Sequence, residues 1–82
     1  MRIIRFLKRA EKDLLDLPVV DRATIVAAVE ALGRGAPNAD VKKLRGVVNQ
    51  YRLRVGRFRV LFTVVENGTI IVGRVADRGS AY

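Results

Sequence analysis

The sequence predicts an α+β fold: an N-terminal strand, two helices, then a three-stranded antiparallel run, with the strands in one sheet and the helices on one face. Three observations lead to this prediction. Residues 2–7 are rich in the branched and aromatic side chains typical of strands. Residues 8–33 carry helix-like spacing of apolar residues, and residues 50–76 hold three β-rich segments separated by glycine turns. A chain of 82 residues is expected to form one domain, spanning residues 1–82.

Two helices are expected between the first strand and the loop over residues 33–40. The first helix covers residues 8–17. Pro18 suits the first turn of the second helix, with Asp16 as a candidate cap. One apolar stripe at positions i, i+3, i+4 and i+7 is made by Ile25, Ala28, Val29 and Leu32. Gly33 is expected to end this helix, because glycine tolerates a left-handed conformation.

Two turn signals predict the register of the remaining strands, at residues 50–55, 58–66 and 69–76. Both Gly56-Arg57 and Asn67-Gly68 are expected to be two-residue turns. The first turn gives the apolar pairs Tyr51–Phe62, Leu53–Val60 and Val55–Phe58. The second turn extends the same face with Val60–Val75, Phe62–Gly73 and Val64–Ile71. A slip of one residue would destroy this segregation, which favours the register.

The opposite face of the predicted sheet collects arginines. Arg54 lies directly across from Arg59, and Leu61 lies between Arg52 and Arg74. Arg57 and Arg78 are expected near each other, further out. Like charges directly opposed destabilise a sheet, so a bound polyanion is the expected compensation. Nearer Asn67-Gly68 the same face is predicted to be apolar, which favours a protein partner or cover by another part of the chain. That apolar strip comprises Thr63, Val65, Ile70 and Val72.

Charge and composition narrow the function. The net charge is +8, and residues 42–82 hold nine basic and two acidic residues. Seven of those nine are arginine, which suits bidentate phosphate contacts, so nucleic acid or an acidic protein is the expected partner and a merely solubilising surface the alternative. Without cysteine or histidine, no disulfide, metal or cofactor is expected. No segment has the character of a membrane span or secretion signal, so a cytoplasmic protein without a membrane partner is expected.

Four stretches resemble the RelE/ParE toxin superfamily of bacterial and archaeal toxin–antitoxin systems. They are "RIIRFLKRAEKDLLDLP", "KKLRG" at 42–46, "YRLRVGRFRVLF" at 51–62 and "NGTIIVGRVADRGSAY" at 67–82. The resemblance implies the α+β fold already predicted and a lysine-leucine loop at 42–46. In the RelE branch it implies metal-independent cleavage of mRNA in the ribosomal A site, where the ribose 2′-hydroxyl attacks the adjacent phosphate and leaves a 2′,3′-cyclic product. ParE-type members act on DNA gyrase instead.

The resemblance also implies roles for single residues. Arg52 and Arg54 would flank the scissile phosphate, Arg59 would stabilise the developing charge, Arg78 would assist the leaving 5′-oxygen and Tyr82 would stack on a base. Further RNA contacts are expected from the basic residues Lys42, Lys43, Arg45, Arg57 and Arg74. Antitoxin contacts are expected from Arg52, Arg54, Arg59, Leu61, Val65, Ile70 and Val72.

Two departures from the family pattern leave the activity open. Arginine stands at Arg52 and Arg54, where relatives often have lysine, and arginine is a poor general base because it stays protonated. Asp77 stands where many relatives have histidine. The leading interpretation is an mRNA endonuclease; the alternatives are a gyrase inhibitor and a degenerate relative that only binds antitoxin or RNA. An acidic antitoxin with apolar anchors is the expected partner, and it would also supply contacts to promoter DNA.

Overall fold

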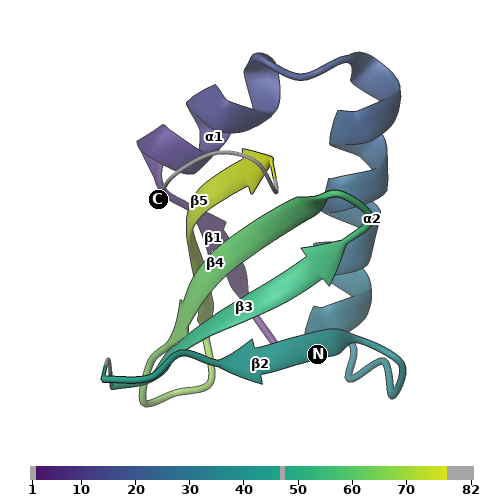
Figure 1. The fold of residues 1–82 in the computed structure, drawn as a ribbon. Coiled ribbons are helices and arrows are strands. Elements are labelled where there is room, and N and C mark those ends of the chain that lie inside the picture. Colours follow the sequence, from purple (N-terminus) through teal and green to yellow (C-terminus); the bar gives the residue numbers. More distant parts are fainter. Residues whose placement is uncertain (1, 47, 78–82) are drawn as a thin grey trace.

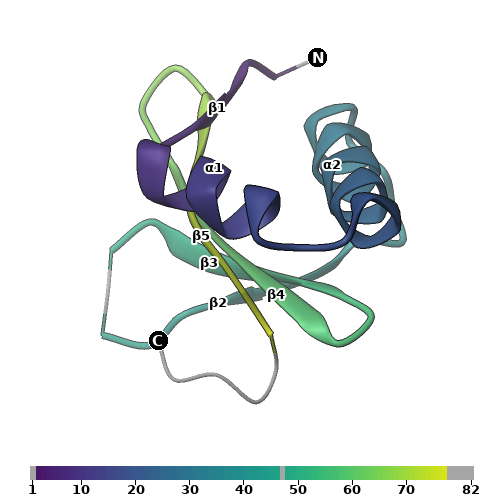
Figure 2. The same cartoon turned by 90° about the horizontal axis from the view of Figure 1, so that it is seen from above.

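A computed structural model describes residues 2–46 and 48–77 of the chain. Its elements are β1 (Ile4–Phe6), α1 (Lys8–Leu15), α2 (Val19–Gly33), β2 (Asp40–Lys43), β3 (Gln50–Val55), β4 (Phe58–Val64) and β5 (Ile70–Asp77). The strands form one sheet in the order β1-β5-β4-β3-β2 (Figure 1). Both helices lie on the same side of this sheet (Figure 2). The predicted α+β fold is confirmed, with β2 as a strand that the sequence did not predict.

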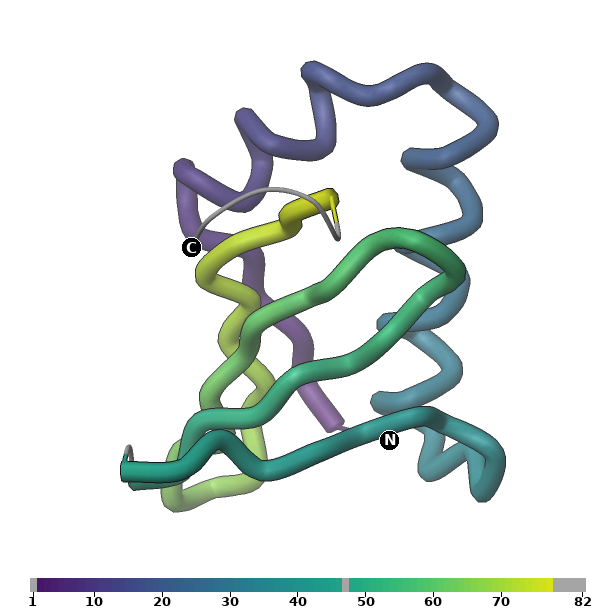
Figure 3. The backbone as a smooth tube through the Cα atoms, in the orientation of Figure 1, coloured from purple at the N-terminus to yellow at the C-terminus, as the bar shows by residue number. Residues whose placement is uncertain are grey.

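The parallel pair β1–β5 lies at one edge of the sheet, and all other neighbours are antiparallel. The backbone trace shows β1 beside β5, with β2 at the opposite edge next to β3 (Figure 3). Neither helix of the described chain has the length and apolar character needed to cross a bilayer.

The core fills the space between the helices and the inner face of the sheet. α1 contributes Ala10 and Leu14, and α2 contributes Ile25 and Val29 from the predicted stripe. The strands contribute Leu53, Phe58, Val60, Phe62, Ile70, Val72 and Val75. Tyr51 and Phe62 stack on this face with ring centroids 5.5 Å apart. The helices therefore occupy one face, which leaves the other face of the sheet for a ligand.

Two details at the helix ends differ from the prediction. Asp16 is the C-cap of α1 and does not cap α2, whose N-cap is Pro18 without a side-chain hydrogen bond. Gly33 is the last residue of α2, as expected, but the left-handed residue is Gly35, with φ +82°. Gly33 instead permits close packing, because a Cβ there would lie 2.8 Å from Cδ1 of Ile4.

The predicted β3–β4 register is confirmed, including the direct opposition of Arg54 and Arg59. The predicted β4–β5 register is correct from Leu61 toward the start of β4: Leu61 pairs with Arg74 and Val60 with Val75. Nearer the turn it is wrong by one residue: Phe62 pairs with Val72 and Val64 with Ile70. A bulge that leaves Gly73 unpaired joins the two registers.

The cause of the slip is the turn itself. The N–H of Val65 donates to the carbonyl of Thr69 at 3.0 Å, so three residues, not two, form the loop. Asn67 Oδ1 accepts from the N–H of Thr69, and Gly68 takes φ +85°. The shifted register turns Ile70 and Val72 into the core, where both are 0% exposed. The expected apolar strip on the open face is therefore wrong for these two residues, and neither presents a surface to an antitoxin.

Candidate functional site

The candidate site begins at the edge strand β2. Its antiparallel pairing with β3 places Asp40 opposite Arg54 and Lys42 opposite Arg52. Directly opposed residues share a face with Cβ atoms about 5 Å apart, so both β2 side chains lie on the arginine face. The resemblance predicted a loop for residues 42–46, which is wrong for Lys42 and Lys43. All four β2 residues are exposed, as suits an edge strand whose charges discourage further strand pairing.

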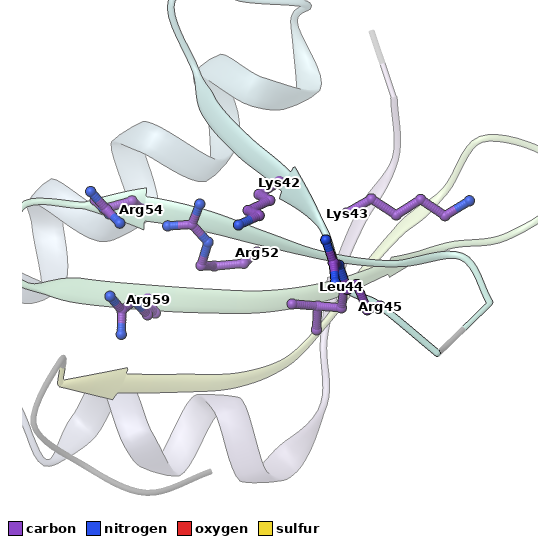
Figure 4. A pocket seen from close by; sticks show the side chains of 7 residues that line it. All are labelled: Lys42, Lys43, Leu44, Arg45, Arg52, Arg54 and Arg59. Atoms are coloured by element: carbon purple, nitrogen blue, oxygen red, sulfur yellow. The ribbon is translucent and has the colours of Figure 1, made fainter.

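An open cleft of about 400 Å³ lies over β2, β3 and the start of β4. Six cationic side chains and one apolar side chain line it: Lys42, Lys43, Leu44, Arg45, Arg52, Arg54 and Arg59 (Figure 4). The cleft thus brings together three residues predicted to be catalytic and three predicted to bind RNA. Lys42 points toward Arg52, whereas the side chain of Lys43 extends away from it (Figure 4).

Two arginines that line this cleft each have a buried donor nitrogen without a hydrogen-bond partner in the described chain. Arg52 is only 9% exposed, and its Nη1 is buried without a hydrogen-bond partner among the described residues. Arg59 is partly buried, and its Nε is also buried without a hydrogen-bond partner among the described residues. Leaving a buried charged donor unpaired costs free energy, and this cost is removed when an acceptor binds. The arrangement therefore suits an anion with several oxygen acceptors, such as a phosphate.

Asp40 is an acidic residue beside this cleft, outside its lining, that the sequence did not single out. Its carboxylate lies 3.9 Å from Nη2 of Arg52 and 3.8 Å from Nε of Arg54. The proximity of Asp40 to these two arginines becomes evident only from the pairing of β2 with β3. The one sequence signal was its position two residues before Lys42, which places both side chains on one face once a strand is assumed.

Arg57 and Arg74, both predicted to bind RNA, lie outside the cleft. Arg57 stacks over the ring of Phe58 at 5.0 Å and forms an ion pair with Asp77 at 3.2 Å. Arg74 Nε donates to Asp13 Oδ2 at 2.9 Å, and the same oxygen accepts from the N–H of Val75. Asp13 thereby accepts the hydrogen bond of a β5 N–H that lies beyond the end of β1. Arg74 pairs with the same carboxylate, so we assign it to this structural contact.

The remaining predicted residues divide into two groups. Leu61 is partly exposed and opposite Arg52 on the open face, and Val65 is 36% exposed near the turn, so both remain candidates for antitoxin contact. Arg78 and Tyr82 lie outside the described residues. Within residues 2–46 and 48–77, no three carboxylate, imidazole or thiol side chains gather as ligands for a metal ion.

The sequence and fold are similar to those of known toxins. Toxin RelE3 of Methanocaldococcus jannaschii is 37% identical over 84 residues, covering 96% of this chain and 93% of that protein. The RelB–RelE antitoxin–toxin complex from Methanococcus jannaschii has 34% identity and a TM-score of 0.75, covering 90% of this chain and 89% of the matched one. The toxin–antitoxin complex RelBE2 from Mycobacterium tuberculosis has 28% identity and a TM-score of 0.81, covering 94% and 98%.

These similarities define the class as toxins of type II toxin–antitoxin systems, within the RelE/ParE superfamily. The match to the family described as the ParE toxin of the type II toxin–antitoxin system parDE extends over residues 4–82, and the chain belongs to that family.

Proposed function

We propose that this toxin binds mRNA phosphates in the cleft and cuts mRNA in the ribosomal A site, and that a cognate antitoxin neutralises it. The observation that supports RNA binding most directly is the pair of buried, unpartnered donors, Arg52 Nη1 and Arg59 Nε, in a cleft lined by six cations. The relative named RelE3 and the RelB–RelE complex support the assignment to a toxin with a protein antitoxin.

The proposed reaction is a transesterification within the RNA. The 2′-oxygen forms a bond to the adjacent phosphorus and loses its proton to water, while the bond from phosphorus to the 5′-oxygen breaks and that oxygen gains a proton from a general acid. Negative charge develops on the phosphate oxygens as the reaction proceeds. Arg52, Arg54 and Arg59 are held on neighbouring strands, so they can stabilise this charge without being rearranged.

Proton transfer needs a residue of a different type, because arginine stays protonated in proteins. Among the described residues that line the cleft, only the two lysines can deliver a proton to the leaving 5′-oxygen. Lys42 faces the cleft beside Arg52, and Lys43 extends away from it (Figure 4). We therefore assign this role to Lys42, on the strand that the sequence did not predict.

The proposed antitoxin carries acidic residues that meet the cleft and apolar residues that meet Leu61 and Val65 beside it. Such a partner would use charge complementarity for rapid, selective association. Promoter DNA would be bound through the antitoxin, which would supply the DNA-binding part of the complex.

Mapping mRNA 5′ ends in translating cells after induction tests the endonuclease. We expect new ends in phase with codons for the wild-type protein and their loss for Arg59→Ala. Arg5→Ala is the matched control, since Arg5 is an exposed arginine on β1, at the opposite edge of the sheet from β2. Undiminished translation and no codon-phased ends with the wild-type protein would refute the endonuclease.

Inhibition of DNA gyrase is the second candidate, favoured by the match to the ParE family over residues 4–82. A supercoiling assay with purified gyrase discriminates between the two. Inhibition that persists in Arg59→Ala would support a gyrase inhibitor that does not use the cleft for catalysis.

A further inference from the structure

Asp40 is a carboxylate beside two arginines of the cleft, whose lining among the described residues carries only cationic charge. It lies opposite Arg54, which in turn lies opposite Arg59, so the three residues form one row across β2, β3 and β4. Its distances of 3.9 Å to Arg52 and 3.8 Å to Arg54 are those of ion pairs and are too long for good hydrogen bonds. Asp40 thus lowers the local charge without satisfying the directional donors.

The unsatisfied donors indicate where a phosphate would bind. Arg52 Nη1 and Arg59 Nε are buried and unpartnered within the described chain, whereas the side chains of Arg54 and Asp40 are 50% and 55% exposed. Arg59 is on the same cross-strand row as Asp40, and Arg52 is on the adjacent row with Lys42, so a phosphate that accepts from both donors lies close to Asp40. The phosphate and the carboxylate would therefore repel each other while sharing Arg52 and Arg54.

We propose that Asp40 is a resident counter-ion that competes with RNA phosphate for Arg52 and Arg54 and so limits the affinity of the cleft. This inference rests on the proposed RNA binding and assigns the residue that sets its strength. Because Asp40 is half exposed, its carboxylate can rotate into water when RNA binds, so it weakens binding without blocking it. A ligand that also reaches the buried donors overcomes the competition, whereas an anion that contacts only Arg54 does not.

Fluorescence anisotropy with a labelled single-stranded RNA of 2′-O-methyl nucleotides measures binding without cleavage. Asp40→Asn removes the competing charge and should bind this RNA about tenfold more tightly than wild type, the size expected for one like-charge contact in a partly exposed setting. The slope of log affinity against log salt should steepen by roughly 0.7, as expected for one additional phosphate contact to single-stranded nucleic acid.

Asp16→Asn is the matched control, because it makes the same charge change at the corner between the helices, on the other side of the sheet. It should change the affinity less than about twofold, since salt and solvent screen an exposed charge on the helix side of the sheet. Asp40→Thr, a neutral residue with high strand propensity, should reproduce the Asp40→Asn result if asparagine weakens the β2 edge.

The inference is overturned if both neutral variants at position 40 bind RNA no more tightly than Asp16→Asn, or bind it more weakly. Weaker binding would mean that Asp40 holds the arginines in place. The outcome is separable from the proposed endonuclease. If the position-40 variants bind RNA more tightly and the wild type does not cleave mRNA, Asp40 competes with phosphate but the protein is not an endonuclease. If the wild type cleaves mRNA and the variants bind RNA as tightly as wild type, the protein is an endonuclease and Asp40 does not compete.

Discussion

Replacing Arg59 with methionine should make the unbound protein more stable while weakening RNA binding. Arg59 lies directly opposite Arg54, and its Nε is buried without a partner in the described chain. Methionine keeps most of the aliphatic packing of the side chain and removes both the charge and the unsatisfied donor. The substitution therefore removes the destabilisation that Arg59 causes in the free protein, and it also removes the hydrogen-bond donor that a bound phosphate would use.

The magnitude follows from these two contributions. An unsatisfied buried donor costs about 1–3 kcal/mol. Cβ atoms of directly opposed residues are about 5 Å apart, and two like charges at that separation would repel by roughly 0.8–3 kcal/mol for effective dielectric constants between 80 and 20. The length of the arginine side chains and the exposure of Arg54 place this pair near the lower end. Allowing for lost hydration and imperfect repacking, we expect a net gain of about 1.5 kcal/mol in the free energy of unfolding. For a domain of this size, that corresponds to a rise of about 6–12 °C in Tm.

Urea and thermal denaturation of the isolated toxin measure this gain, with Arg5→Met as the control. Arg5 is exposed on β1 and has no arginine opposite it in the register, so its replacement should change stability by less than about 0.5 kcal/mol. Raising the salt concentration should reduce the gain at Arg59, since screening removes the repulsive part. An Arg59→Met protein that is less stable than wild type would refute the view that the arginine pair is strained without its ligand.

Three further substitutions test other parts of the structure. Asp13→Ala should lower the free energy of unfolding by about 2–4 kcal/mol in urea denaturation, because it leaves Arg74 and the Val75 N–H without their shared acceptor. Gly68→Ala should cost about 1 kcal/mol in the same assay, because the residue has φ +85°. Lys42→Ala should reduce the salt slope of RNA binding by roughly 0.7, as expected for one lost phosphate contact.

The sequence predicted the arginine face because the β3–β4 hairpin has strong local signals. Alternating apolar residues and a glycine at φ +58° allow only one register in which the core side chains share a face. Arg54 and Arg59 were therefore placed opposite each other correctly. The same logic failed at Asn67-Gly68, because a two-residue turn and a three-residue turn followed by a bulge at Gly73 fit the same sequence.

The strand β2 could not be predicted, because its four exposed residues have no alternating pattern. Its position is fixed by antiparallel pairing with the next strand, β3, from Asp40 opposite Arg54 to Lys43 opposite Tyr51. The ion pairs of Arg57 and Arg74 could not be predicted from local sequence either, because their acidic partners lie elsewhere in the chain. Acidic residues of α1, α2 and β5 form ion pairs with these two side chains outside the cleft: Asp13 with Arg74, and Asp21 and Asp77 with Arg57.

The row formed by Asp40, Arg54 and Arg59 makes a last prediction, because one substitution should move stability and affinity in opposite directions. Asp40 attracts Arg54 in the free protein, and Arg59 repels it. Asp40→Asn should therefore lower the free energy of unfolding by up to about 1 kcal/mol, the usual range for an exposed ion pair. The same variant should bind RNA more tightly, whereas Arg59→Met should be more stable and bind more weakly. Measuring both quantities for both variants tests whether the cleft trades stability of the free toxin against affinity for an anion; a variant whose stability and affinity rise together would contradict it.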